Sequence, residues 1–336
     1  MMKILRYILF PFVPIYFLVT WLRNKLYDID IKVSKSYNFP VICVGNLSVG
    51  GTGKTPMIEY LIRLLKNDYH VATLSRGYKR DTKGFVLADG NSTAESLGDE
   101  PFQFYSKFNA DVDVVVDEDR QHGIETLKSK RPSVNVVLLD DAYQHRKVKA
   151  GLNILLTTYQ NPYFNDMVLP TGNLREAKSG AKRADIIVVT KCPKALNDKE
   201  KHDLYKKIKP EFHQTVFYSW ITYAEQLIST DSVLNINDLK DFTLVTGIAN
   251  PKPLVKFLKG KGLSFEHSSF SDHHTFSQLE VDVLAKKELI ITTEKDFMRL
   301  KKYKSLKNKL FYLPITINIS DAVKFNNLIK DSVKQH

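Results

Sequence analysis

The chain has 336 residues, of which 43% are hydrophobic and 26% are charged, and this balance excludes a disordered or collagen-like protein. A formal net charge of +12 favours an anionic partner, such as nucleic acid, anionic lipid or a phosphorylated substrate, although scattered lysines are also typical of a solvated basic surface. Cys43 and Cys192 are the only cysteines, which excludes a disulfide framework and a cysteine-based zinc cluster and fits a reducing compartment. The length favours two domains.

The first predicted element is an apolar run from Tyr7 to Leu22, flanked by Lys3 and Arg6 on one side and by Arg23 and Lys25 on the other. The run is shorter than the roughly 20 residues that a spanning helix needs, and two prolines interrupt it. Its aromatic residues suit the headgroup layer, so we predict a membrane-associated helix within residues 1–30 that lies in the membrane surface. The alternatives are a plain core helix and a signal peptide, but no small-residue cleavage site follows.

Short apolar strands then alternate with helical stretches, a pattern that is typical of βαβ units around a buried parallel sheet. The predicted strands are Val41–Gly45, Val71–Ser75, Val112–Val116, Val134–Leu139, Asn153–Thr157 and Ile186–Thr190. The fold class is therefore α/β, and we assign residues 31–220 to the first domain.

The pattern changes at an extended aromatic strand, Val216–Ile221. The strands predicted after it are Leu244–Gly247, Phe265–Phe270, Leu289–Thr293 and Leu310–Ile315. They predict a smaller α/β C-terminal domain over residues 221–336. The boundary near residue 220 is soft, because the late strand could return and pair with residues 216–221 as a two-stranded hinge.

The clearest chemical signal is S-V-G-G-T-G-K-T, which follows the first strand and opens a helix. Glycines let backbone N–H groups converge on phosphate oxygens at a helix N-terminus, as in P-loop NTPases. Lys54 would reach the β- and γ-phosphates and the Thr55 hydroxyl would hold Mg²⁺. The expected nucleotide-binding residues are Ser48, Val49, Gly50, Gly51, Thr52, Gly53, Lys54 and Thr55. Ser48 departs from the general pattern, which has glycine at that position.

Two carboxylates, Asp140 and Asp141, end the apolar run that begins at Val134. The carboxyl ends of parallel strands form the ligand-binding edge of an α/β sheet, so these acids are expected beside the phosphate loop, where they would bind the metal directly or through water. The alternative is an acid pair at a helix N-terminus.

The reaction class depends on two further segments. Thr190–Pro193 lacks the Asn and Asp of an N-K-x-D element, which weakens a guanine-specific interpretation. A kinase needs a group that accepts the proton of the acceptor hydroxyl, and Asp99 and Glu100, in the loop G-D-E-P, are candidates.

Together these motifs are similar to one family over nearly the whole chain. The chain resembles the tetraacyldisaccharide 4′-kinases, the lipid A 4′-kinases of Gram-negative bacteria, which commonly have Ser or Thr at the position of Ser48. The segments that carry the resemblance are V-G-N-L-S-V-G-G-T-G-K-T-P (44–56), L-S-R-G-Y (74–78), G-D-E-P (98–101), D-D-A-Y-Q-H (140–145), L-P-T-G-N-L-R-E (169–176), G-I-A-N-P (247–251), F-S-D-H-H (270–274) and T-E-K-D (293–296).

The resemblance implies phosphorylation of the 4′-hydroxyl of a tetraacylated glucosamine disaccharide 1-phosphate, a lipid substrate, with ATP and Mg²⁺ as cofactors. It places the enzyme on the cytoplasmic face of the inner membrane. It also implies two α/β lobes joined by a strand pair and a partly inserted N-terminal helix.

By motif position, the resemblance implies that Asp99 is the catalytic base and that His273, from the other lobe, orients it. The alternatives are His274 in that role and a zinc site at Asp272, His273 and His274. The remaining implied roles are phosphoryl contact for Lys54 and Arg175, metal binding for Thr55, Asp140, Asp141 and Glu176, and acceptor contact for Arg76 and Tyr78, with Arg120 and His145 as further substrate-binding candidates.

Three residues depart from the common pattern of the family: Ala142, Tyr143 and Asn173. They leave the acids, Arg175 and Glu176 intact, so we expect a local change of loop shape. The alternative function is a membrane-associated P-loop ATPase that acts as a nucleotide-dependent switch or chaperone. A nucleic-acid-binding module rests on net charge alone, so no nucleic-acid partner is predicted. The sequence leaves the question of protein partners open.

Overall fold

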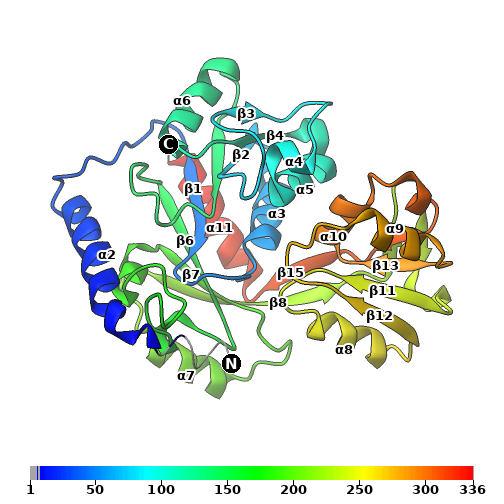
Figure 1. Ribbon diagram of the computed structural model, residues 1–336. Coiled ribbons are helices and arrows are strands. Elements are labelled where there is room, and N and C mark those ends of the chain that lie inside the picture. Colours follow the sequence, from blue (N-terminus) through cyan, green and yellow to red (C-terminus); the bar gives the residue numbers. More distant parts are fainter. Residues whose placement is uncertain (1–5, 7, 336) are drawn as a thin grey trace.

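The computed structural model describes residue 6 and residues 8–335, which form two β-sheets with helices packed against them (Figure 1). The α/β class predicted from the sequence is confirmed. Tyr7, where the predicted apolar run begins, and Lys3 beside it lie outside the described residues.

The larger sheet has nine strands in the order β15-β8-β7-β6-β1-β5-β2-β4-β3. The strands from β8 to β4 are parallel, and β15 and β3 pair antiparallel at the two edges. The strands are β1 (Val41–Asn46), β2 (Val71–Ser75), β3 (Val86–Leu87), β4 (Val112–Val116), β5 (Val136–Asp140), β6 (Leu152–Thr158), β7 (Ile186–Thr190), β8 (Thr215–Tyr223) and β15 (Ile315–Ile319).

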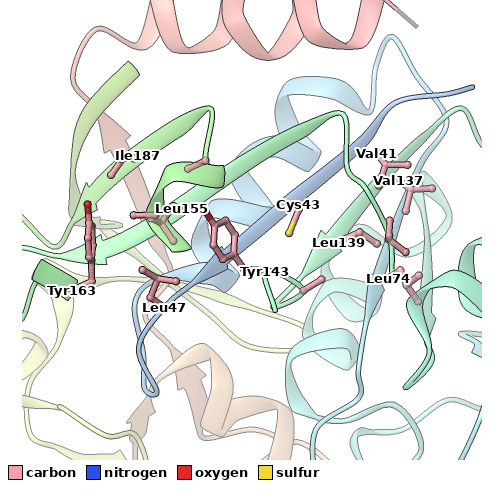
Figure 2. Packing of buried hydrophobic residues seen from close by; sticks show 14 of the residues in the cluster. Val41, Cys43, Leu47, Leu74, Val137, Leu139, Tyr143, Leu155, Tyr163 and Ile187 are labelled. Atoms are coloured by element: carbon pink, nitrogen blue, oxygen red, sulfur yellow. The ribbon is translucent and has the colours of Figure 1, made fainter. Parts of the chain in front are cut away.

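Helices cover both faces of this sheet, so its central strands are buried on two sides and appear in the sequence as apolar runs. One face packs against α3 (Lys54–Leu65), α5 (Asp99–Phe108) and α11 (Ala322–Lys334). The other face packs against α6 (Arg120–Lys130) and α7 (Asp198–Ile208). Figure 2 shows this second face, where Cys43 and Tyr143 lie among aliphatic side chains.

The smaller sheet has six strands in the order β10-β9-β14-β13-β11-β12. Its elements are β9 (Gln226–Ile228), β10 (Val233–Asn235), β11 (Phe242–Thr246), α8 (Lys252–Gly260), β12 (Phe265–Ser269), α9 (Gln278–Ala285), β13 (Ile290–Thr292), α10 (Glu294–Leu300) and β14 (Leu310–Tyr312). Helix α8 packs on one face, and α9 and α10 pack on the other. We call the two sheets with their helices the larger and the smaller lobe.

The end of the chain differs from the sequence-based expectation. The strand predicted over Leu310–Ile315 is two strands, β14 and β15, separated by Leu313 and Pro314 and placed in different sheets. Strand β15 pairs antiparallel with β8, as the predicted hinge requires. Helix α11 then buries Phe325, Ile329 and Val333 on the larger sheet (Figure 1), so residues 221–336 do not all belong to one second body.

The N-terminal segment forms η1 (Phe10–Phe12) and α2 (Val13–Asp28), which lies along the outside of the larger lobe (Figure 1). Val13 and Tyr16 face the lobe, and Tyr27 is buried. The opposite side of the helix is apolar and exposed, with Ile15 at 61% and Leu18 at 58%. Within the described part of the chain, no helix combines the length and the apolar character needed to cross a bilayer.

Candidate active site

The segment between β1 and α3 has the backbone of a phosphate-binding loop. Gly50 and Gly53 have φ of +108° and +92°, values that favour glycine, and Gly53 leads directly into α3. Two hydrogen bonds hold the loop in place. Thr190 Oγ1 donates to the carbonyl of Thr52 at 2.7 Å, and Lys191 Nζ donates to the carbonyl of Gly51 at 2.6 Å. The structure thus places the N-terminus of α3 at the carboxyl edge of the larger sheet, where anions bind.

Lys54, Asp141 and Arg175 meet beside this loop. Asp141 accepts hydrogen bonds from the two terminal nitrogens of Arg175 at 2.9 and 3.1 Å, and its Oδ1 lies 3.7 Å from Lys54 Nζ. Burial alone would raise the pKa of Asp141, but the two cations outweigh it and lower that pKa. The carboxylate therefore holds both cations at the position where phosphate oxygens are expected.

Asp140, at the end of β5, is suited to a divalent cation. Its side chain is buried, and Oδ1 has no hydrogen-bond partner among the described residues. Burial and the nearby charge of Glu100 raise its pKa to about 7, against the opposing effect of Lys54. Because Mg²⁺ usually takes one or two carboxylates together with phosphates and water, this acid and the Thr55 hydroxyl fit the ion. The described residues contain no cluster of three acids, histidines or cysteines that could hold a metal.

Glu176 does not join this group of acids. It is 2% exposed, and its carboxylate already accepts hydrogen bonds from Asn24, Gln144 and Arg183. All three partners are donors, and they occupy both oxygens of the carboxylate. The geometry therefore supports a structural role for Glu176 and does not support the expected metal contact. Gln144 also accepts a hydrogen bond from Arg175 at 3.3 Å, which connects Glu176 indirectly to the phosphate site.

Arg120 and His145 are two further substrate-binding candidates, of which Arg120 is buried in the lobe and His145 is partly buried beside it. Arg120 is 3% exposed and donates to the carbonyls of Asp117 and Glu118. His145 Nε2 accepts from the backbone N–H of Arg120 at 3.3 Å. Their positions favour an electrostatic effect on Asp140 and Asp141 over direct contact with a substrate.

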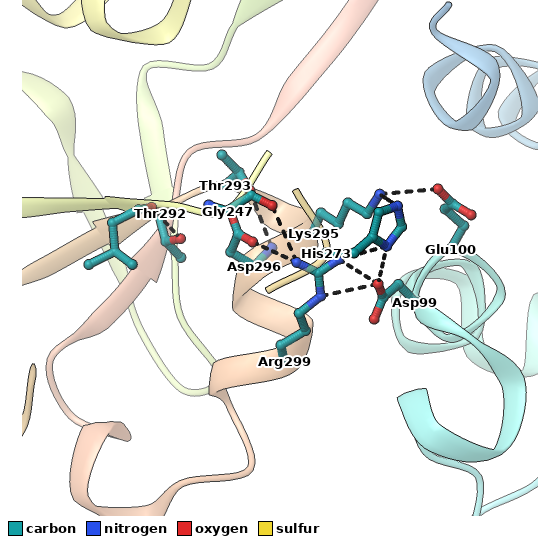
Figure 3. Close-up of polar contacts among 10 residues, drawn as sticks. Asp99, Glu100, Gly247, His273, Thr292, Thr293, Lys295, Asp296 and Arg299 are labelled. Carbon is teal, nitrogen blue, oxygen red and sulfur yellow. Dashed lines mark hydrogen bonds and ion pairs between the residues drawn. The ribbon is translucent and has the colours of Figure 1, made fainter. Parts of the chain in front are cut away.

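The structure brings Asp99 and His273 together across the boundary between the lobes (Figure 3). Asp99 is the first residue of α5 in the larger lobe, and His273 lies in the loop between β12 and α9 in the smaller lobe. His273 Nδ1 is 3.0 Å from Asp99 Oδ2. Gly98, with φ of +91°, permits this position, because a Cβ there would lie 3.0 Å from the carbonyl oxygen of Tyr78.

Two cations of α10 complete this cluster and were not predicted as site residues. Arg299 Nε donates to Asp99 Oδ2 at 3.1 Å, and its Nη2 donates to the same oxygen. Lys295 Nζ lies 3.0 Å from His273 Nε2 and 3.3 Å from Glu100 Oε1. The sequence contained one indication of these two residues. The T-E-K-D segment contains Lys295, and Arg299 follows it one helical turn later.

The contacts of this cluster determine the pKa of Asp99. Burial of its carboxyl group favours the protonated form, but the hydrogen bonds from His273 and Arg299 outweigh burial, so its pKa lies well below the usual range. Asp99 is therefore an anion at every physiological pH.

One of the two acceptor-side candidates, Tyr78, lies next to the same cluster. Arg76 and Tyr78 are exposed in the loop after β2, and the Tyr78 ring packs edge-on against His273 at 5.7 Å between centroids. His274 points elsewhere, because its Nε2 contacts Glu280 and its ring stacks on Phe270. The alternatives that used His274 as the partner of Asp99, or as a zinc ligand, therefore have no support in this arrangement.

The residues that depart from the family pattern have defined contacts. Ala142 is buried in the core of the larger lobe beside Tyr143, whose hydroxyl donates to the carbonyl of Gly180 at 2.8 Å and whose ring lies under Arg183. Asn173 accepts a hydrogen bond from Arg6 at 2.8 Å, which links Arg6 to the larger lobe.

Comparison with known proteins assigns this geometry to one family. A family model described as tetraacyldisaccharide-1-P 4′-kinase matches residues 5–334. The chain is 53% identical to a tetraacyldisaccharide 4′-kinase of Flavobacterium johnsoniae, over 94% of this chain and 93% of the relative. A protein of the same name from Bacteroides thetaiotaomicron is 44% identical over 98% and 93% of the two chains.

A solved structure agrees with the sequence relatives. The crystal structure of LpxK from Aquifex aeolicus in complex with ATP superposes with a TM-score of 0.80 and 33% identity, over 98% of this chain and 99% of that one. Both the sequence and the fold are thus shared over almost the entire length. The chain belongs to the tetraacyldisaccharide-1-P 4′-kinase family.

Proposed function

We propose that the chain transfers the γ-phosphoryl group of ATP to the 4′-hydroxyl of a tetraacyldisaccharide 1-phosphate, giving lipid IVA in lipid A biosynthesis. The observation that carries this proposal is the arrangement of two clusters at the carboxyl edge of the larger sheet. One cluster, Lys54 with Asp141 and Arg175, lies beside a phosphate loop. The other, Asp99 with His273, lies at the boundary between the lobes.

In this proposal the first cluster binds the phosphates of ATP. Backbone N–H groups of the loop and Lys54 bind the β- and γ-phosphates, and Arg175 neutralises charge on the transferred group. Mg²⁺, held by Asp140 and the Thr55 hydroxyl, supplies further charge neutralisation when it is bound. Asp141 keeps Lys54 and Arg175 in place before the nucleotide arrives.

The second cluster handles the acceptor. Asp99 accepts the proton of the 4′-hydroxyl, and His273 fixes the orientation of the carboxylate. Arg76 and Tyr78, exposed in the loop after β2, line the side from which the sugar enters, and the Tyr78 ring packs against His273. Because Asp99 binds a proton weakly in this environment, it acts chiefly by orienting the hydroxyl and receives the proton late in the transfer.

The exposed apolar side of α2 and the positive net charge support a membrane surface as the second partner. An acylated acceptor stays in the bilayer, so the enzyme must bring its phosphate loop to the headgroups. An anionic leaflet attracts a chain of charge +12, and ATP is available on the cytoplasmic side. We place the enzyme at the cytoplasmic face of the inner membrane.

The test is phosphoryl transfer from labelled ATP with Mg²⁺ and detergent-solubilised tetraacyldisaccharide 1-phosphate, compared with a reaction that lacks the acceptor. Label should appear in the lipid only when the acceptor is present. Nucleotide hydrolysis that is independent of the acceptor, with no labelled lipid, would contradict the proposal and favour a switch or chaperone ATPase.

A further inference from the structure

We propose that Lys295 and Arg299 of α10 form a cationic clamp that positions Asp99 and His273 for phosphoryl transfer. The inference rests on the proposed kinase function and assigns a role to two residues outside the expected site. They touch the acid and the histidine rather than the substrate, so both are positioning residues. Figure 3 shows the two side chains reaching from the smaller lobe to the start of α5.

Arg299 fixes one oxygen of Asp99. Its Nε and Nη2 both donate to Oδ2, the oxygen that also faces His273 Nδ1. Oδ1 has no hydrogen-bond partner among the described residues, so it is the oxygen left for the acceptor hydroxyl. Two donors of one rigid guanidinium group fix the position of Oδ2 more strictly than the single contact of an ammonium group does.

Arg299 is itself held by a buried acid. Its Nη1 donates to Asp296 Oδ1 at 3.0 Å, and Asp296 is 0% exposed. The other oxygen of Asp296 accepts from the Gly247 N–H at 2.8 Å and from Thr293 Oγ1 at 2.7 Å. The guanidinium group therefore lies between a rigid carboxylate of the smaller lobe and the catalytic carboxylate of the larger lobe.

Lys295 determines which nitrogen of His273 carries the proton. An ammonium group has donors only, so the Nε2 atom that lies 3.0 Å from Lys295 Nζ must accept. The remaining proton is then on Nδ1, which donates to Asp99 Oδ2. Arg299 Nη2, 3.2 Å from Nδ1, donates to the same carboxylate oxygen and does not require a lone pair on the ring.

The clamp also offsets a concentration of negative charge. Glu100 and Asp296 contact the two cations directly, and the charge of Asp272 acts on Arg299. Without the cations these acids would face Asp99 and favour its protonated form. The spacing of Lys295 and Arg299, one helical turn apart, puts both on the side of α10 that faces α5.

The test uses Arg299→Gln, Arg299→Lys and Lys295→Met in the full chain. The matched control is Lys302→Met, because Lys302 also crosses the lobe boundary but pairs with the exposed Glu95. We expect Arg299→Gln to lower kcat about 10- to 100-fold with an unchanged KM for ATP. As the solution is acidified, the kcat of Arg299→Gln should begin to fall at a higher pH than the kcat of the wild type. Arg299→Lys should recover part of the rate, and the control should behave as the wild type.

A second readout does not depend on turnover. The ¹⁵N chemical shifts of histidine distinguish the two tautomers, and His273 should be Nδ1–H in the wild type and a mixture in Lys295→Met. An unchanged kcat and pH profile in Arg299→Gln, or unchanged His273 shifts in Lys295→Met, would overturn the proposal. If the wild type itself transfers no phosphate but the His273 shifts change as expected, the clamp stands and the kinase assignment fails.

Discussion

Asp99, the proposed general base, combines two properties that are seldom found together. Its carboxylate is well ordered by three donors, yet its pKa is far below that of an ordinary aspartate. Phosphoryl transfer tolerates a weak base because the transition state is loose and the hydroxyl loses its proton late. The value of Asp99 lies in the fixed direction of its free oxygen.

Replacing this carboxylate should separate binding from chemistry. We expect Asp99→Asn to lower kcat by about 10²- to 10⁴-fold, because an amide cannot accept the proton. ATP affinity, measured by calorimetry, should stay within about twofold of wild type, since Asp99 makes no contact with the phosphate loop. Asp282→Asn, at an exposed position on α9, is the control. Full turnover in Asp99→Asn would show that another group takes the proton.

The residues differ in how far the sequence could predict them. The phosphate loop is local, so S-V-G-G-T-G-K-T was sufficient to predict its position and backbone. Asp99 was a candidate base from its loop, together with Glu100, but its pairing with His273 came from the family resemblance, because no spacing rule relates residues on two lobes. Arg299 and Lys295 acquire their contacts only when α10 meets α5, and Glu176 could not be separated from the acids expected to bind the metal without its buried partners.

Helix α2 connects its exposed apolar side to the phosphate site. Asn24 donates to Glu176, Glu176 and Arg175 both contact Gln144, and the Tyr16 hydroxyl donates to the carbonyl of Arg175 at 2.9 Å. A helix that serves only as an anchor needs none of these contacts. The docking of α2 therefore supports the loop that carries Arg175.

This connection predicts an effect that membrane binding cannot explain. Asn24→Ala should lower kcat about 3- to 10-fold in detergent micelles, because buried Glu176 loses a donor and the position of Gln144 relaxes. Thr20→Ala is the matched control on the same helix, since the Thr20 hydroxyl bonds only to carbonyls of α2. Equal rates for the two variants would mean that the Asn24 contact is irrelevant to the reaction.

The contact between α3, α5 and α10 is sensitive to pH. Lys107 bridges Glu59 and Glu294 at 2.7 and 2.6 Å, and burial, followed by the charge of Glu59, raises the pKa of Glu294 to about 7. An acid with a raised pKa contributes stability below its unfolded pKa, about 4.3, and loses this contribution as the pH rises through about 7. Burying the charged form is therefore unfavourable at alkaline pH.

Glu294→Gln removes this titration. Relative to wild type, its melting temperature should be higher at pH 8 than at pH 5, because only at pH 8 does the wild type bury the charge. Glu95→Gln, at an exposed ion pair, should show a much smaller pH-dependent difference. A relative melting temperature that does not change with pH would contradict the raised pKa.

The elements of the larger sheet were predictable because doubly buried strands appear as apolar runs. Their order was not, since β1 lies between β5 and β6, which come from much later in the chain. The prediction of a single strand over Leu310–Ile315 was wrong. Pro314 has no N–H to donate, so β14 ends before it, and β15 begins after it in the other sheet. The short β9–β10 hairpin has too little apolar periodicity to be recognised.

For the whole molecule, the exposed apolar side of α2 offers a sharper test of membrane binding than deletion of the segment. Deletion would also remove Asn24 and Tyr16 from the site, so its effects would be mixed. Replacing Ile15, Leu18 and Val19 with serine leaves these inward contacts in place. We expect the triple variant to lose co-sedimentation with anionic vesicles, because the buried apolar area supplies most of the affinity.

The same variant should still bind ATP and should work on detergent-dispersed acceptor. Val233→Ser with Val323→Ser, exposed apolar positions far from α2 in the sequence, is the control. Undiminished vesicle binding by the triple variant would mean that another surface holds the protein at the membrane.

The return of the chain to the larger lobe through β15 and α11 has a consequence for synthesis. Phe325, Ile329 and Val333 pack in the same core as the helix that follows the phosphate loop. On the ribosome, α2 emerges before the larger sheet and is available for the proposed membrane contact while translation continues, whereas this core stays open until residues 315–334 have left the exit tunnel. With the proposed role of α2, a nascent chain can therefore bind its membrane before its catalytic lobe is complete, and truncation near the C-terminus should yield a protein that co-sediments with vesicles but is inactive.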